Sequence, residues 1–301
     1  MLGTAGCATA CTGRAMGTTF RILVHGAPGL GAQAVRRIGE LERRWSRFLP
    51  DSEITALNAG DGPVRVSSDT VRLVDAMCAA WRATAGAFDP TLVGAIVRLG
   101  YAASRDDRRR VTQLAPSVAD AGQPAWIHVD RGRRVVALPP GTGLDPGGLG
   151  KGLAADIVTS ELLEAGAAAA LVEIGGDVAV AGDPPEGAWP IALGDSARGG
   201  VLVVRRGGVA TSTIARRRWT HGGTARHHLL DPATRQPTDG SVVTATVVAG
   251  TAAWAETFTK VAFVDGAETA IATYANTGLA ASVTTSAGAV LDTPAWKEFH
   301  R

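Results

Sequence analysis

Asp145-Pro146-Gly147-Gly148-Leu149-Gly150-Lys151-Gly152 is the most informative stretch of this chain. Four of its eight residues are glycine, so the backbone can approach a ligand closely and adopt positive φ. A helical pattern follows to about residue 165, which places Lys151 just inside that helix. Free N–H groups and the dipole at a helix N-terminus favour negative charge. The stretch therefore predicts a turn that binds phosphate; the alternative is a glycine-rich strand-to-helix turn without a ligand.

The stretch matches neither of two common phosphate-binding motifs. A Walker A loop needs glycine first and Ser or Thr after the lysine, but Asp145 and Gly152 stand at these positions. A G-x-G-x-x-G motif would need a third glycine at Leu153. Only three of the chain's 30 basic residues are lysine, so the lysine retained here suggests that a compact, mobile ammonium is required.

Composition limits the class of protein. The chain has 301 residues, 46% of them hydrophobic and 19% charged, which is typical of a folded globular protein. A net charge of +2 does not require a nucleic-acid partner, and the arginine clusters at 108–110 and 216–218 are interpreted as solvated loops or strand edges. There is no apparent signal peptide and no run of 18 apolar residues, so we expect a soluble, cytoplasmic protein without membrane insertion.

The order of expected elements favours an α+β fold. Residues 18–25 alternate as a strand does, and residues 126–138 and the segment around 286–288 are typical of hairpins. Helical periodicity marks residues 33–48, 67–85, 252–264 and 267–276. Strands and helices do not alternate strictly, which argues for mixed sheets with flanking helices. We expect residues 1–15 to be a flexible tail and 16–301 to form a single domain, with 103–124 on its surface.

Five other loops share one character: glycine or proline beside Asp, Thr, Ser or His at a strand end. They are Asp51-Ser52-Glu53 with Asn58, Phe88-Asp89-Pro90-Thr91, Gly175-Gly176-Asp177, Thr211-Ser212-Thr213 and the segment 227–234. Any one of them alone is more often a turn or a cap. Together with the glycine-rich stretch they predict a cleft built from loops on a rigid scaffold.

In this order the motifs resemble those of the ApbE family of FAD:protein FMN transferases. The resemblance begins at Met16-Gly17-Thr18, passes through each loop above, and ends in the helix at 252–264, so it covers nearly the whole chain. It implies an ApbE-like α+β fold with a ligand cleft between two lobes. It also implies an enzyme that cleaves the FAD pyrophosphate, transfers FMN to a Thr or Ser hydroxyl of an acceptor flavoprotein, and releases AMP.

The resemblance further implies roles for individual residues. The residues expected to bind FAD are Met16, Ala87, Phe88, Asp89, Asp145, Gly147, Gly148, Lys151, Thr211, Ser212 and Leu229. His228 stands where the family's proposed general base lies, and histidine suits proton transfer near neutral pH. Lys151 and Lys260 are the other two candidate catalytic residues, since positive charge next to the pyrophosphate stabilises its cleavage.

The chain departs from the family at the metal site. The usual pattern is Ala-Asp followed by Thr four residues after the Asp, and these side chains hold Mg²⁺ with a backbone carbonyl near Gly148. Here Glu256 replaces Asp and Lys260 replaces Thr. An ammonium cannot be a metal ligand, and Glu256 and Lys260 have the i, i+4 spacing of an ion pair on a helix. We expect the Lys260 ammonium, held by Glu256, to occupy the place of the metal; the alternative is an ordinary solvated pair.

Two smaller departures and two other functions stay open. Thr213 and Arg235 stand where the family usually has glycine, and Arg235 is a candidate for another phosphate contact. Without its metal the chain would bind FAD or another nucleotide but not transfer it. A third interpretation is a flavin-dependent redox protein.

Overall fold

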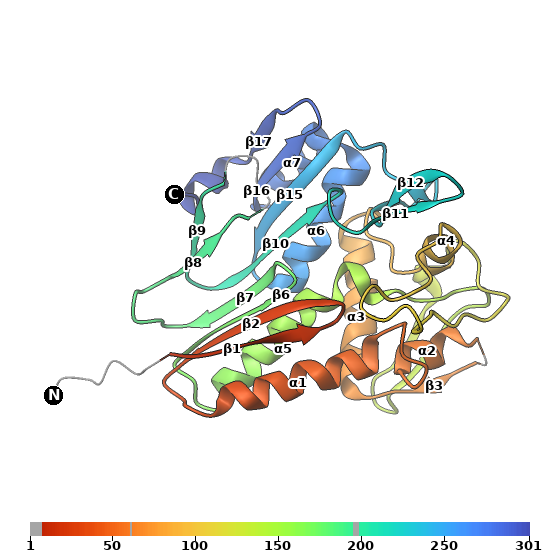
Figure 1. The fold of residues 1–301 in the computed structure, drawn as a ribbon, viewed down its shortest axis with the longest axis horizontal. Helices are drawn as coiled ribbons and strands as arrows, with labels where there is room; N and C mark the ends of the chain where they lie inside the picture. The colour runs from red at the N-terminus through yellow and green to blue at the C-terminus, as the bar shows by residue number, and fades with distance from the viewer. Residues whose placement is uncertain (1–7, 61, 195–198) are drawn as a thin grey trace.

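The computed structural model describes residues 8–60, 62–194 and 199–301, and an eight-stranded sheet forms its centre (Figure 1). All neighbouring strands in this sheet are antiparallel. In spatial order the strands are β1 (Thr9–Ala15), β2 (Thr18–His25), β6 (Ala169–Ile174), β7 (Asp177–Gly182), β10 (Gly207–Thr213), β15 (Val242–Ala249), β16 (Ala280–Thr285) and β17 (Val290–Asp292). This antiparallel sheet with its helices confirms the predicted α+β class.

Four helices pack on one face of the sheet, and a fifth lies outside them. The four are α1 (Leu30–Trp45), α5 (Gly150–Glu164), α6 (Ala252–Asp265) and α7 (Ala267–Asn276), and the outer one is α3 (Ser68–Ala83). Alternate strand residues, such as Val172, Ala210 and Val247, point to this face and are buried against the helices. The two hydrophobic clusters formed in this way hold α5 and α6 firmly under the sheet.

The other face of the sheet is covered by a hairpin and the C-terminus. The hairpin is β8 (Trp189–Ala192) with β9 (Val201–Val204), and the last turn is the 3₁₀ helix η3 (Pro294–Glu298). Trp189, Leu202 and Trp296 are buried there against the residues that alternate with those of the helix face, such as Val209. Because both faces are covered, the strands are apolar on both sides, and their ends carry the polar loops.

Shorter elements gather near one end of the sheet, beside α3 (Figure 1). The helical ones are α2 (Glu53–Asn58), α4 (Val93–Arg98), η1 (Pro124–Trp126) and η2 (Pro146–Gly148). The strands are β3 (Val64–Arg65), β4 (His128–Asp130), β5 (Val135–Ala137), β11 (Arg218–His221), β12 (Thr224–His227), β13 (Leu230–Asp231) and β14 (Gln236–Pro237). Among the helices of the described ranges, none is both long and apolar enough to cross a bilayer.

The predicted tail at residues 1–15 is wrong for its second half. Residues 9–15 form β1, which pairs with β2 through a two-residue turn at Met16 and Gly17. Both turn residues have positive φ (53° and 69°), as the favoured two-residue hairpin turns require. Small residues such as Ala10 and Gly13 give β1 little apolar alternation, so its sequence did not indicate a strand. Residues 1–7 lie outside the described ranges.

The helix predicted at 33–48 begins and ends earlier. It starts at Leu30 and ends at Trp45, because Ser46 is extended and donates its N–H to the carbonyl of Glu42. Pro50 disfavours helical backbone at the residue before it, so the chain turns here. Phe48, the last residue of the predicted helix, lies beyond its end and lines the cavity described below.

Candidate active site

A cavity of about 590 Å³ lies where the turns of the sheet meet the glycine-rich stretch. This volume is in the range of small-molecule sites, roughly 300–1,000 Å³. Every residue predicted to bind FAD, hold a metal or catalyse lines it: Met16, Ala87, Phe88, Asp89, Asp145, Gly147, Gly148, Lys151, Thr211, Ser212, His228, Leu229, Glu256 and Lys260. The structure thus brings together segments that are up to 244 residues apart, although the role of each residue stays a prediction.

The glycine-rich stretch is held in place by Asp145. One carboxylate oxygen accepts a hydrogen bond from the N–H of Gly147 at 2.9 Å, and the other lies 3.2 Å from Nε of the buried Arg47. A side chain at Gly148 would not fit, since its Cβ would lie 2.9 Å from the ring of Phe88. The backbone of Gly148 therefore packs directly against Phe88, and both residues line the cavity. Such a close approach of backbone is expected of a turn that contacts a ligand.

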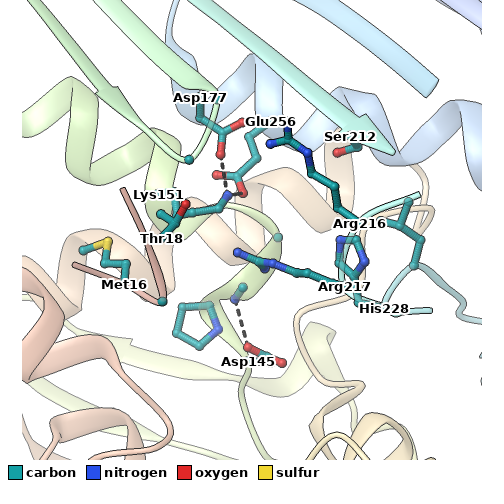
Figure 2. A pocket seen from close by; sticks show the side chains of 18 of the residues that line it. Met16, Thr18, Asp145, Lys151, Asp177, Ser212, Arg216, Arg217, His228 and Glu256 are labelled. Carbon is teal, nitrogen blue, oxygen red and sulfur yellow. Dashed lines mark hydrogen bonds and ion pairs between the residues drawn. The ribbon is translucent and has the colours of Figure 1, made fainter. Parts of the chain in front are cut away.

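Lys151 is bound by two carboxylates from distant elements. Its ammonium donates to Asp177, at the start of β7, and to Glu256, on α6 (Figure 2). The second oxygen of Glu256 accepts a hydrogen bond from the N–H of Gly152 at 2.8 Å. Asp177 is 3% exposed and Glu256 is 1% exposed, so this group of charges ties the sheet, α5 and α6 together inside the protein. Asp177 was quoted in a motif, but its part in the site was not predicted.

The protonation of this group follows from burial and charge. Burial and the neighbouring Glu256 raise the pKa of Asp177, and the Lys151 ammonium opposes this only in part. Burial also acts to raise the pKa of Glu256, but Lys151, Lys260 and the Gly152 N–H outweigh it, so that pKa lies below its ordinary value. Burial lowers the pKa of Lys151, and the two carboxylates raise it above normal. Lys151 therefore stays charged, and Asp177 is the carboxylate that most readily takes up a proton.

Lys260 lies beside the glycine-rich stretch, and Glu256 holds it more closely through its backbone carbonyl than through the predicted ion pair. Its ammonium donates to the backbone carbonyl of Glu256 at 2.7 Å and lies 3.9 Å from the carboxylate of that residue. The expected i, i+4 ion pair is thus long, because Lys151 takes the carboxylate. The Lys260 Cε would be 3.4 Å from a Cβ on Gly148, which puts the side chain where the family pattern expects a metal. Burial lowers the pKa of Lys260 to about 8.

The residues at this place do not fit Mg²⁺. Mg²⁺ requires several oxygen ligands in near-octahedral geometry. Both oxygens of the Glu256 carboxylate already have donors, and the Lys260 ammonium beside Gly148 would repel a cation. Within the described ranges no group of three His, Cys, Asp or Glu side chains could hold an ion. Glu256 and Gly148 are therefore poor candidates for a metal site in this chain.

His228 faces the same cavity from the loop between β12 and β13. Its Nδ1 is buried and has no hydrogen-bond partner in the part of the chain that the structure describes. Burial lowers its pKa well below the ordinary value, and the charges of Arg217, Lys260 and Lys151 lower it further. The imidazole is therefore neutral near pH 7, which is the state that a general base requires.

The predictions for the arginines were partly wrong. Residues 216–218 were interpreted as a solvated loop or strand edge; Arg216 and Arg218 are exposed and Arg218 begins β11, but Arg216 and Arg217 also line the cavity. Arg235, the candidate phosphate contact, is exposed in the turn between β13 and β14 and is not part of the cavity wall. Its φ of 59° explains why the family usually has glycine at this position. Arg47 was not predicted at all, since nothing in the sequence marks a buried guanidinium.

The remaining nucleotide-binding candidates are shaped by local hydrogen bonds. The carboxylate of Asp89 accepts from the N–H and the hydroxyl of Thr91 at 2.7 and 2.6 Å, which fixes the turn after Phe88. Burial raises the pKa of Asp89, and the two bonds to Thr91 oppose the rise. Met16 donates its N–H to Glu42 at 2.8 Å, so the tip of the β1–β2 hairpin is tied to α1.

Comparison with known proteins supports the resemblance seen in the motifs. The model of the ApbE family matches residues 16–283. The FAD:protein FMN transferase of Rhodobacter capsulatus is 29% identical over 75% of this chain and 46% of the relative, so the chain spans about half of that protein. The enzyme of the same name from Haemophilus influenzae is 26% identical over 86% of this chain and 81% of the relative.

A solved structure agrees with the sequence comparisons. The crystal structure of the ApbE protein of Thermotoga maritima matches 98% of this chain and all of that chain, with a TM-score of 0.83 and 26% identity. The family match covers most of the chain, and the fold agrees over almost all of it. The chain therefore belongs to the ApbE family.

Proposed function

We propose that this protein is an FAD:protein FMN transferase, which moves FMN from FAD to a Thr or Ser hydroxyl of an acceptor flavoprotein and releases AMP. Family membership and the printed function of the relatives support this proposal. The observation that carries it is the placement of His228, a neutral base, in one cavity with the glycine-rich stretch and Lys260.

The arrangement suits in-line transfer of a phosphoryl group. A hydroxyl is a weak nucleophile until a base takes its proton, and His228 is the neutral base available in the cavity. The N–H groups of the glycine-rich turn and the start of α5 are donors for phosphate oxygens. Negative charge develops on the departing AMP, and fixed cations stabilise it best in a site that excludes water.

Lys260 takes the part that a divalent cation plays in the usual family pattern. Its ammonium lies beside Gly148, faces the cavity and, among the described residues, has one short hydrogen bond, to the carbonyl of Glu256. Lys151, in contrast, is bound by two carboxylates, those of Asp177 and Glu256. Lys151 is thus suited to holding the wall of the site, and Lys260 to contacting the pyrophosphate. Transfer should therefore not require Mg²⁺.

Incubation of the purified chain with FAD and an acceptor flavoprotein, in EDTA or in Mg²⁺, tests the proposal. We expect covalent flavin on the acceptor and stoichiometric AMP in both conditions. Tight FAD binding without AMP release would instead identify a nucleotide-binding protein. Reduction of bound flavin by a nicotinamide donor, without transfer, would identify a redox protein. The acceptor and the cytoplasmic location stay predictions.

A further inference from the structure

Arg217 is a cation of the cavity for which the described residues offer no acidic partner. It lies in the connection between β10 and β11, is half-buried, and directs its guanidinium into the middle of the pocket with His228 beside it (Figure 2). Within the described ranges no carboxylate forms an ion pair with it. Its φ of 50° is in the left-handed region, which is unusual for a residue with a side chain.

The neighbouring cations differ from Arg217 in this respect. Lys151 is bound by Asp177 and Glu256, and Arg47 contacts Asp145 and the carbonyl of Tyr101. These charges are compensated within the protein, and they stabilise its walls. Among the described residues none accepts a hydrogen bond from the guanidinium of Arg217, which leaves its donors available on the cavity side.

The charge of Arg217 acts on three other groups in the cavity. Burial is the largest cause that lowers the pKa of Lys260 and of His228, and the charge of Arg217 lowers both further; at Lys151 burial and Arg217 oppose the rise in pKa that the two carboxylates cause. Arg217, Lys151 and Lys260 are positive groups that repel one another across the cavity, and an anion that enters stabilises them. A guanidinium also presents two parallel N–H donors, which match the oxygens of a phosphate group.

We propose that Arg217 binds the diphosphate of FAD and stabilises the charge that develops on AMP during transfer. This inference rests on the proposed transferase function. In the reaction the acceptor hydroxyl oxygen forms a bond to the phosphorus of FMN, and its proton goes to the imidazole of His228. The bond between that phosphorus and the bridging oxygen breaks, and its electron pair leaves with AMP. Arg217 donates hydrogen bonds to the phosphate oxygens throughout.

Two flavins separate a phosphate contact from a general effect on the pocket. Riboflavin has the ring system and ribityl chain of FAD but no phosphate. For Arg217→Gln we expect the dissociation constant of FAD, measured by calorimetry, to rise about 10- to 100-fold, the range for losing hydrogen bonds to a charged group. The dissociation constant of riboflavin should not change.

Arg235→Gln is the matched control. Arg235 is also a loop arginine with positive φ, but it is exposed and lies outside the cavity, so its loss should leave FAD binding unchanged. If Arg217→Gln binds FAD as the wild type does, or loses riboflavin equally, this inference is wrong while the proposed function stands. If the wild type itself neither binds FAD nor releases AMP, the proposed function fails first, and this inference fails with it.

The pH dependence of kcat/KM also distinguishes a direct role of Arg217 from a structural one, because a purely structural role would not shift it. His228 acts as a base only when it is deprotonated, and Arg217, Lys260, Lys151 and His227 all lower its pKa. Removing Arg217 raises that pKa, so the acidic limb of kcat/KM should move to higher pH in Arg217→Gln and stay in place in Arg217→Lys. An unmoved limb in Arg217→Gln, with wild-type kcat, would contradict the inference.

Discussion

The two sides of the cavity are built on different electrostatic principles. The glycine-loop wall consists of residues 145–151 with Asp177 and Glu256, and each of its charged side chains has a partner in the protein. The arginine wall consists of residues 212–217 with His228. In the described ranges Arg217 has no acidic partner, and the buried Nδ1 of His228 has no hydrogen-bond partner. The charges of the glycine-loop wall are compensated within the protein. The arginine wall, in contrast, has hydrogen-bond donors and positive charge available for a ligand.

We infer from this difference that the glycine-loop wall mainly stabilises the fold and that the arginine wall mainly contributes to binding and turnover. Breaking a buried ion pair by removing one partner typically costs about 3–5 kcal/mol, because the other charge stays buried and uncompensated. Removing a group that has no partner in the protein costs little stability. Substitutions in the glycine-loop wall should therefore unfold the protein more easily, and those in the arginine wall should change binding and turnover in a protein that is still folded.

His228→Gln should have the largest effect on turnover. Loss of a general base typically lowers a rate by about 10²–10⁴-fold. We expect that decrease in the rate of FMN transfer, measured by covalent flavin on the acceptor, with urea unfolding and FAD affinity close to those of the wild type. Transfer at the wild-type rate would show that another group takes the proton and would contradict the division between the walls.

Lys151→Met should have the largest effect on stability. It leaves the Asp177 and Glu256 carboxylates buried without an ammonium, so the free energy of unfolding should fall by about 3–5 kcal/mol at pH 8 in urea. Because burial and Glu256 raise the pKa of Asp177, that group takes up a proton as the pH falls, and the loss should be smaller at pH 5.5. Exposed Lys297→Met is the control, with no measurable loss expected. Equal stability of the two variants would refute the structural role of Lys151.

The pH dependence of transfer should report on Lys260. Its pKa, lowered by burial to about 8, means that the ammonium loses its proton as the pH rises through that value. The rate should therefore fall on the alkaline side of about pH 8 in the wild type. Lys260→Arg, whose guanidinium stays charged, should keep its rate there. If the alkaline limb is the same in both proteins, it belongs to another group.

Arg235→Gly should have the smallest effect and the opposite sign. A residue with a side chain costs about 1–2 kcal/mol in the left-handed region, and the flexibility of glycine in the unfolded chain offsets about 0.5–1 kcal/mol of that. We expect stability in urea to rise by roughly 0.5–1 kcal/mol. FAD binding should be unchanged, since Arg235 lies outside the cavity. A decrease in FAD affinity would place this arginine in the site after all.

The sequence predicted the members of the cavity better than their contacts. The candidate residues implied by the family resemblance all line the cavity, because the loops that carry the resemblance are marked by glycine, proline and polar side chains. Motifs and spacing missed β1, whose small residues carry little pattern, and the contact of Lys151 with Asp177 and Glu256, which depends on the packing of α5, α6 and the sheet. Spacing along α6 indicated a pair between Glu256 and Lys260, but a tertiary contact took precedence.

Titration of FAD into the protein by calorimetry, once in EDTA and once in Mg²⁺, tests most directly whether side-chain cations replace the divalent ion. We predict the same dissociation constant in both buffers for the wild type. The double variant Glu256→Asp with Lys260→Thr, which restores the usual family pattern, should bind FAD more tightly in Mg²⁺ than in EDTA. Wild-type binding that appears only when Mg²⁺ is present would contradict the account.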